Sequence, residues 1–305
     1  MKSRPESQDF PNALQIWLLA ARPKTLPAAA VPVIVGTAVA ISEDVFRLLP
    51  ALAALVAALL IQIGTNLAND VFDYKKGTDA AGRLGPLRVT QAGLLTPDQV
   101  MAGMGLIFGL AVLIGVYLSV VGGWPVVVIG VLSIASGIAY TGGPFPLGYN
   151  GLGDLFVFIF FGLVAVCGTY YVQAGAVSAA ACWAAFPVGL LTTALLVVNN
   201  LRDIHTDRAA GKRTLAVRLG VTGARAEYLL LVGLAYLTPL PMVLVGETGP
   251  WSFSVWLSLP LFVPLVRLIL HREGRVLNQA LAGTARLELV YGLLFSLGLI
   301  VSAHC

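Results

Sequence analysis

Long apolar runs of about 20 residues recur along the chain, and shorter polar stretches separate them. A run of about this length is what a helix needs to cross the hydrocarbon core of a bilayer. The hydropathy pattern predicts membrane-spanning helices over residues 26–42, 48–69, 100–121, 124–140, 153–174, 182–200, 228–246, 252–270 and 287–304. Residues 1–25 are expected to form a cytoplasmic N-terminal tail, followed by a single transmembrane domain over residues 26–305.

The composition agrees with an all-α, polytopic membrane protein of nine transmembrane helices. Of the 305 residues, 58% are hydrophobic and only 11% are charged, which is too little polar surface for a soluble domain of this length. The three cysteines have neither metal-ligand nor disulfide spacing. The formal net charge of +4 is expected to reflect orientation in the bilayer, so no nucleic-acid partner is expected.

Basic residues are distributed very unevenly between the two sides of the predicted bundle. With the N-terminus in the cytoplasm, every lysine and arginine except Arg47 falls in a cytoplasmic segment. This asymmetry is the positive-inside pattern, and shifting the chain by one helix would destroy it. We therefore expect an integral membrane protein with a cytoplasmic N-terminus and with Cys305 on the opposite side.

Two clusters of polar residues end two of the apolar runs. Each cluster has an asparagine, an aspartate four residues later, and a second aspartate three or four residues after that. The clusters are Asn66–Asp70–Asp73, after the second predicted helix, and Asn199–Asp203–Asp207, after the sixth. At about 100° per residue, such positions share one face of a helix. Because the clusters lie four helices apart, the chain is predicted to contain two parallel four-helix repeats plus one further helix.

Carboxylates packed so closely repel one another unless a cation lies among them, and oxygen atoms are the ligands that Mg²⁺ prefers. Nearby basic side chains could bind the remaining charge of a polyphosphate. They are Lys75, Lys76, Arg88, Arg202, Arg208, Lys212 and Arg213. The sequence therefore predicts a Mg²⁺–polyphosphate site at the cytoplasmic end of the bundle. The alternative to a metal site is that these carboxylates form interfacial salt bridges, above all Asp79 and Asp207. His205 could be a metal ligand or a base, but a loop residue is the simpler interpretation.

Five stretches around these clusters resemble the UbiA superfamily of intramembrane prenyltransferases. The two aspartate-rich motifs are NDVFDYKKGTD (69–79) and DIHTDRAAGKRTLAVRLG (203–220). A narrower resemblance, to the branch that prenylates 1,4-dihydroxy-2-naphthoate, rests on RPKTLPAAAVPVIVGTA (22–38), GPLRVTQAGLL (85–95) and YTGGPFPLGYNGLGD (140–154). The similarity covers residues 22–220, whereas beyond residue 228 only hydropathy and helix count agree.

The resemblance implies nine helices around a cavity, with Mg²⁺ as cofactor and with a polyprenyl diphosphate and 1,4-dihydroxy-2-naphthoate as substrates. The implied metal ligands are Asn66, Asp70, Asp73, Asp203 and Asp207. The four aspartates among them are also implied to be catalytic, together with Lys212. The implied substrate-binding residues are Arg22, Lys24, Asn66, Asn69, Lys75, Arg88, Gln91, Tyr140, Tyr149, Asn199 and Arg202. The implied reaction releases carbon dioxide and serves menaquinone biosynthesis at the cytoplasmic side of a bacterial inner membrane.

Other functions stay open at this point. Within the superfamily the acceptor could be 4-hydroxybenzoate, homogentisate or haem, although the stretch 140–154 favours the naphthoate. A transporter is the alternative from another class, but it should carry an ionisable residue near mid-membrane, and the predicted helices place none there. Because loss of carbon dioxide restores the aromatic ring, no dedicated base is expected in the site.

Overall fold

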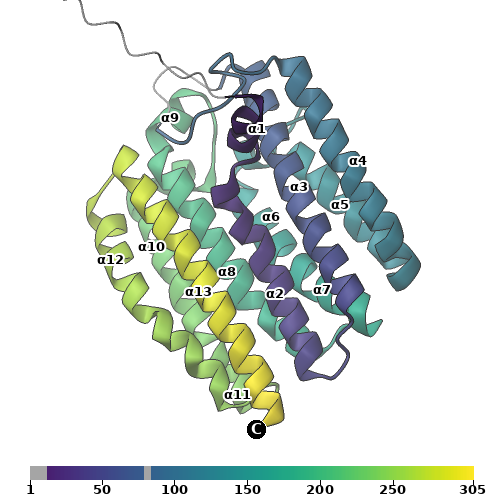
Figure 1. Cartoon of the computed structure of the whole chain (residues 1–305). Coiled ribbons are helices and arrows are strands. Elements are labelled where there is room, and N and C mark those ends of the chain that lie inside the picture. Colours follow the sequence, from purple (N-terminus) through teal and green to yellow (C-terminus); the bar gives the residue numbers. More distant parts are fainter. Residues whose placement is uncertain (1–11, 79–83) are drawn as a thin grey trace, which may run out of the picture.

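The structure is a computed structural model that describes residues 12–78 and 84–305. All regular elements in these two ranges are helical, as the sequence predicts, and most run along one direction of the bundle (Figure 1). The α-helices are α1 (Ala13–Ala21), α2 (Leu26–Ser42), α3 (Leu48–Lys75), α4 (Pro97–Gly122), α5 (Trp124–Ala139), α6 (Gly153–Val157), α7 (Ala165–Ala174), α8 (Ala179–Arg202), α9 (Ile204–Ala209), α10 (Leu215–Leu237), α11 (Pro239–Leu244), α12 (Leu259–His271) and α13 (Leu277–His304). The other helical segments are η1 (Pro23–Thr25), η2 (Gly148–Asn150), the π-helix η3 (Phe158–Val164), η4 (Pro250–Ser258) and η5 (Gly274–Val276).

Eight segments within the described ranges are long and apolar enough to cross a membrane. They are Ala13–Ser42, Leu48–Lys75, Pro97–Gly122, Gly153–Ala174, Ala179–Arg202, Leu215–Leu244, Pro250–His271 and Gly274–His304. The apolar helix α5 is shorter, with 16 residues. The prediction of an all-α, polytopic membrane protein is therefore confirmed.

Residues Ala13–Ala21 form α1 and pack against α3, although the sequence predicts a tail here. A capping box begins this helix, because the Asn12 side chain accepts from the Gln15 amide and the Gln15 side chain accepts from the Asn12 amide. The helix ends at Arg22, which adopts a left-handed conformation. The expectation of a plain tail is wrong for this stretch, and α1 fixes the position from which Arg22 enters the fold.

The last helix begins earlier than hydropathy predicts. α13 starts at Leu277, and not at residue 287. The prediction missed its first turns because they are too polar to stand out in the hydropathy pattern. Arg286 and Glu288 consequently lie well inside a helix. Glu288 is fully buried, and its carboxyl group accepts a hydrogen bond of 2.6 Å from Thr192 of α8. The expectation that no ionisable residue lies deep in the bundle is therefore wrong.

The centre of the bundle is α8, whose residues form much of the main hydrophobic core. α8 packs against α10, α13, α2 and the π-helix η3, and α13 also packs against α2. α3, α4 and α5 pack against one another on the side formed by the first half of the chain (Figure 1). Both polar clusters lie at the same end of this bundle, which we call the motif end.

Two glycines let η3 and α8 approach each other closely. A β-carbon at Gly162 would lie 2.8 Å from the Cα atom of Gly189 and 2.9 Å from the carbonyl oxygen of Ala185. These neighbours are backbone atoms, which cannot turn aside as a flexible side chain could. The crossing of η3 over α8 therefore requires glycine at position 162.

The substitution Gly162→Ala is expected to destabilise the bundle by about 1–3 kcal/mol, because the added methyl group overpacks this crossing. Thermal unfolding of the purified protein in detergent should show a lower melting temperature. Gly105→Ala on α4 is the matched control, since a β-carbon there meets no atom within 4 Å. Equal melting temperatures for the two variants would show that the crossing is not tightly packed.

Candidate active site

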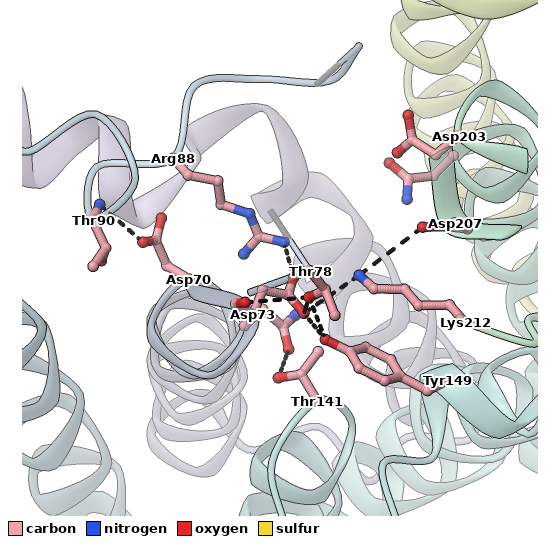
Figure 2. Close-up of polar contacts among 12 residues, drawn as sticks. Asp70, Asp73, Thr78, Arg88, Thr90, Thr141, Tyr149, Asp203, Asp207 and Lys212 are labelled. Carbon is pink, nitrogen blue, oxygen red and sulfur yellow. Dashed lines mark hydrogen bonds and ion pairs between the residues drawn. The ribbon is translucent and has the colours of Figure 1, made fainter. Parts of the chain in front are cut away.

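The carboxylate of Asp73, in the last turn of α3, lies at the centre of the polar groups at the motif end (Figure 2). Asp73 is only 2% exposed. Its two oxygens accept short hydrogen bonds from the Arg88 guanidinium and the Tyr149 hydroxyl. The Thr78 hydroxyl lies 3.4 Å and the Lys212 ammonium 3.5 Å from one of these oxygens. A single buried carboxylate thus joins the end of α3 to three different loops.

Lys212 links the two predicted aspartate motifs. Its ammonium group lies 3.5 Å from a carboxylate oxygen of Asp73 and 4.0 Å from one of Asp207 (Figure 2). The same group lies over the ring of Tyr149, 4.5 Å from the ring centroid. A cation therefore already stands between the two motifs, which is the position that the sequence assigns to a metal ion.

Tyr149 and Lys76 complete this cluster. Burial raises the pKa of the Tyr149 phenol well above its usual range, and the neighbouring Asp73 carboxylate raises it further, so the phenol keeps its proton as a donor. Burial lowers the pKa of the Lys76 ammonium, while Asp73 opposes this shift. Lys76 donates to the carbonyl oxygens of Thr141 and Gly143, at 2.8 and 3.0 Å, and so holds the 140–152 loop against α3.

Asp70 contacts backbone groups rather than the centre of the cluster. Its carboxylate oxygens accept from the amides of Val89 and Thr90, both at 3.1 Å, and one lies 3.9 Å from the Arg22 guanidinium. Because Arg88 directly precedes these two amides, Asp70 fixes the loop that brings Arg88 to Asp73.

Asn66 faces the beginning of the chain. Its amide nitrogen donates to the carbonyl oxygen of Ala21 and to the hydroxyl of Thr25, both at 3.0 Å. It thereby holds the segment that carries Arg22, which lies 3.9 Å from Asp70. Asn66 and Asp70 share a helical face, as predicted, but that face packs against the 21–25 and 88–90 segments.

The second motif is divided between two helices. α8 ends at Arg202 and α9 begins at Ile204, with Asp203 between them, so the prediction of one continuous helical face is wrong here. The Asp207 amide still donates to the Asp203 carbonyl oxygen at 2.8 Å, which keeps the turn compact.

Arg202 is almost fully buried, with 1% of its surface exposed. Its guanidinium donates to Asp203 with two nitrogens, at 2.9 and 2.5 Å, to Asn199 at 2.8 Å, and to Asn278 of α13 at 2.9 Å. The sequence predicts Arg202 and Asn199 to bind substrate. In this structure the hydrogen bonds of Arg202 hold Asp203 and Asn199, and nothing in the sequence pointed to Asn278.

Of the remaining predicted residues, some lie at the site and others are exposed. Asn69 faces the site, because its side-chain oxygen accepts from Thr141 at 2.9 Å, and Gln91 and Tyr140 are partly buried. Lys24 is exposed, and Lys75 is exposed with its ammonium against the sulfur of Met101, away from Asp73. His205 is also exposed and lies 3.5 Å from Glu273, but it belongs to α9, so the expectation of a loop residue is wrong. Asp79 lies outside the described residues.

A largely apolar cavity of about 590 Å³ lies between the helices of the first half of the chain. Tyr140 lines this cavity near the motif end, and Val126 and Val172 line it toward the other end. Its walls come from α2, α3, α4, α5 and the α6–η3–α7 segment. The cavity could hold a long apolar chain beside the polar cluster.

The carboxylates present fit a metal ion that takes some of its ligands from the protein and the others from a bound anion. Within the described residues, no three His, Cys, Asp or Glu side chains lie close enough to hold a metal ion by themselves. Asp73 and Asp207 nevertheless face the same ammonium group from opposite motifs. Phosphate oxygens would have to supply the other ligands, which is a usual arrangement for Mg²⁺.

Residues 29–287 match the UbiA prenyltransferase family. The chain belongs to this family. It is 40% identical over 297 residues to a protein of Escherichia coli named 1,4-dihydroxy-2-naphthoate octaprenyltransferase, covering 94% of this chain and 96% of that protein. A protein of the same name from Mycobacterium tuberculosis is also 40% identical, over 278 residues that cover 91% of this chain and 94% of that protein.

Solved structures of UbiA homologs share the fold. The structure from Aeropyrum pernix matches with a TM-score of 0.68 at 18% identity, covering 90% of this chain and 97% of the other. A UbiA homolog from Archaeoglobus fulgidus bound to GPP and Mg²⁺ matches with a TM-score of 0.64 at 14% identity, covering 92% and 99%. At these identities the likeness establishes the fold alone.

Arg202→Lys is expected to lower the stability of the protein by about 2 kcal/mol or more, because an ammonium group cannot form the same fork of buried hydrogen bonds. Thermal unfolding of the ligand-free protein should show this loss. Arg208→Lys is the matched control, since Arg208 is exposed and makes one long contact of 3.4 Å to the Val217 carbonyl oxygen. Melting temperatures that do not differ between these variants would contradict a structural role for Arg202.

Proposed function

We propose that this chain transfers a polyprenyl group from a polyprenyl diphosphate to 1,4-dihydroxy-2-naphthoate with loss of carbon dioxide, giving a demethylated menaquinol. The observation that carries the proposal is the Asp73–Lys212–Asp207 cluster at the motif end, together with an apolar cavity whose lining includes Tyr140. It is supported by relatives of 34–40% identity that are named 1,4-dihydroxy-2-naphthoate octaprenyltransferase. A diphosphate would lie at the cluster and its apolar tail in the cavity.

The diphosphate and Mg²⁺ are proposed to bind between the two motifs, with Asp73, Asp203 and Asp207 as protein ligands. The bound ion would neutralise the charge that develops on the leaving diphosphate. Asn66 and Asp70, which the sequence also predicts as ligands, would place Arg22 and Arg88 through the contacts described above. Asp73 and Asp207 are assigned because they face Lys212, and Asp203 because the resemblance of the second motif implies it.

Cationic side chains are proposed to hold the rest of the diphosphate charge. Lys212 would move from Asp73 to a phosphate oxygen, a small displacement for a long flexible side chain. Arg88 binds the other oxygen of Asp73, and Lys76 lies over the Tyr149 ring as Lys212 does, so both would contact the same anion. Preorganised positive charge around a leaving group in a water-poor site is a large source of rate acceleration.

The acceptor ring is proposed to lie between the cluster and the cavity, beside Tyr140. An electron-rich carbon that bears the carboxylate forms the new bond to the prenyl group as the carbon–oxygen bond to the diphosphate breaks. The bond to the carboxylate then breaks and its electrons restore the aromatic ring. The apolar walls of the cavity would keep water from the prenyl cation during this step.

The membrane arrangement is part of the proposal. We infer that α5 completes a set of nine spans in two parallel four-helix repeats plus α13, in a bacterial inner membrane. The motif end would then face the cytoplasm, as the distribution of basic residues indicates. A product with a long apolar tail could pass directly from the cavity into the lipid.

Asp73→Asn and Asp207→Asn should each lower the turnover number about a hundredfold or more at saturating Mg²⁺. Each change keeps the shape of the side chain but removes charge from the proposed metal site. Product formation should be measured by chromatography, alongside thermal unfolding that separates lost catalysis from lost folding. Asp98→Asn, at the exposed first turn of α4, is the matched control. A folded Asp207→Asn protein with near-wild-type turnover would contradict the shared site.

Prenylation of carboxyl-labelled 1,4-dihydroxy-2-naphthoate should release one labelled carbon dioxide for each product molecule. The assay uses purified protein, Mg²⁺ and a polyprenyl diphosphate, with 4-hydroxybenzoate as the competing acceptor. Label retained in the product would refute the decarboxylating reaction. A preference for 4-hydroxybenzoate would overturn the acceptor but not the prenyl transfer.

A further inference from the structure

A buried carboxyl group near the motif end has an oxygen without a hydrogen-bond partner. It belongs to Asp154, in the first turn of α6. Asp154 is only 7% exposed, and its Oδ2 atom has no partner among the described residues. A buried polar atom left unpaired costs free energy, so it calls for an explanation. Ionisable groups at such positions in membrane proteins are often functional.

Asp154 lies next to the Tyr140 phenol. Gly153 directly precedes Asp154, and a β-carbon at Gly153 would lie 2.9 Å from the Tyr140 hydroxyl oxygen. Burial raises the pKa of the Tyr140 phenol well above its usual range, and Asp154 raises it more than Asp207 and Asp73 do. The phenol therefore carries a proton, and its hydroxyl lies against the backbone that directly precedes Asp154.

Tyr140 also faces the place where an acceptor would react. It lines the apolar cavity at the end nearest Asp73 and Asp207. Its hydroxyl makes no hydrogen bond within the parts of the chain that the structure describes. A protonated phenol between a buried carboxyl group and the cavity has the groups that a proton relay needs: it can accept one proton and pass on another.

We propose that Tyr140 and Asp154 form a proton relay that takes up the hydroxyl proton of the acceptor while its ring attacks the prenyl donor. This inference rests on the proposed function, since it needs a phenolic acceptor. Tyr140 is the catalytic residue that touches the acceptor, and Asp154 is the residue that receives the proton through it. The proposed relay would supply a base, which the sequence does not predict.

The atoms and charges balance without a further reactant. As the carbon–carbon bond to the prenyl group forms, the carbon–oxygen bond of the donor breaks and the diphosphate leaves with its electron pair. The acceptor hydroxyl becomes a ring carbonyl, and its proton passes to Tyr140 while the Tyr140 proton passes to Asp154. Carbon dioxide then leaves, its bonding electrons return to the ring oxygen, and the same path run backward restores the hydroxyl.

The test measures how Asp154→Asn, Tyr140→Phe and the double variant divide the prenyl donor between prenylated product and prenyl alcohol. Each single change should lower prenylation turnover about a hundredfold or more, with a KM for the donor within about threefold of wild type. The prenyl cation should be captured by water more often, so the ratio of prenyl alcohol to prenylated product should rise. The double variant should lose no more than the worse single variant, because the residues act as one unit.

Asp98→Asn, an aspartate in the first turn of α4, is the matched control and should leave both turnover and product ratio unchanged. Multiplying effects in the double variant, or an unchanged alcohol-to-product ratio in either single variant, would overturn the relay. If Asp154→Asn does not fold, the product ratio of Tyr140→Phe decides alone. Failure of the wild-type protein to prenylate any phenolic acceptor would instead refute the proposed function.

Discussion

The motif end depends on one buried negative charge, the carboxylate of Asp73. A charge buried in this way is costly unless it is paired and hydrogen-bonded, so the groups around it are held in place as strictly as the charge itself. Arg88, Tyr149 and Lys212 reach Asp73 from three separate loops. Val89 and Leu95 anchor the first of these loops in a small hydrophobic cluster, and the contacts of Asp73 join all three loops to α3.

A polar rim and an apolar interior meet at Tyr140, and this boundary explains how the fold can support prenyl transfer. The polar cluster at the motif end supplies fixed charge for a diphosphate, whereas the walls of the cavity are largely apolar and uncharged. A reactive prenyl cation formed at the boundary would meet the acceptor before it met water. The buried carboxyl group of Asp154, adjacent to the same tyrosine, places a proton acceptor at this boundary too.

The sequence predicted the fold class, most spans and the end of the bundle that carries the polar cluster, because hydrophobic periodicity and charge asymmetry are local properties. The sequence could not show which aspartates face the centre of the polar cluster and which contact a loop. Asp70 and Asp73 lie on nearly the same helical face, and only the placement of Val89 and Thr90, set by tertiary packing, turns one toward a loop. The partner of Arg202 on α13 is 76 residues away, and Glu288 was missed because the polar first turns of α13 hide where this helix begins.

The central claim is that the Lys212 ammonium occupies the place of a metal-bound diphosphate between the two motifs. An experimental structure with Mg²⁺ and an unreactive polyprenyl thiodiphosphate tests it directly. The account predicts a metal ion bound to Asp73 and Asp207, with the Lys212 ammonium moved onto a phosphate oxygen and the prenyl chain in the cavity beside Tyr140. A diphosphate bound elsewhere, with Lys212 still between the two carboxylates, would contradict it.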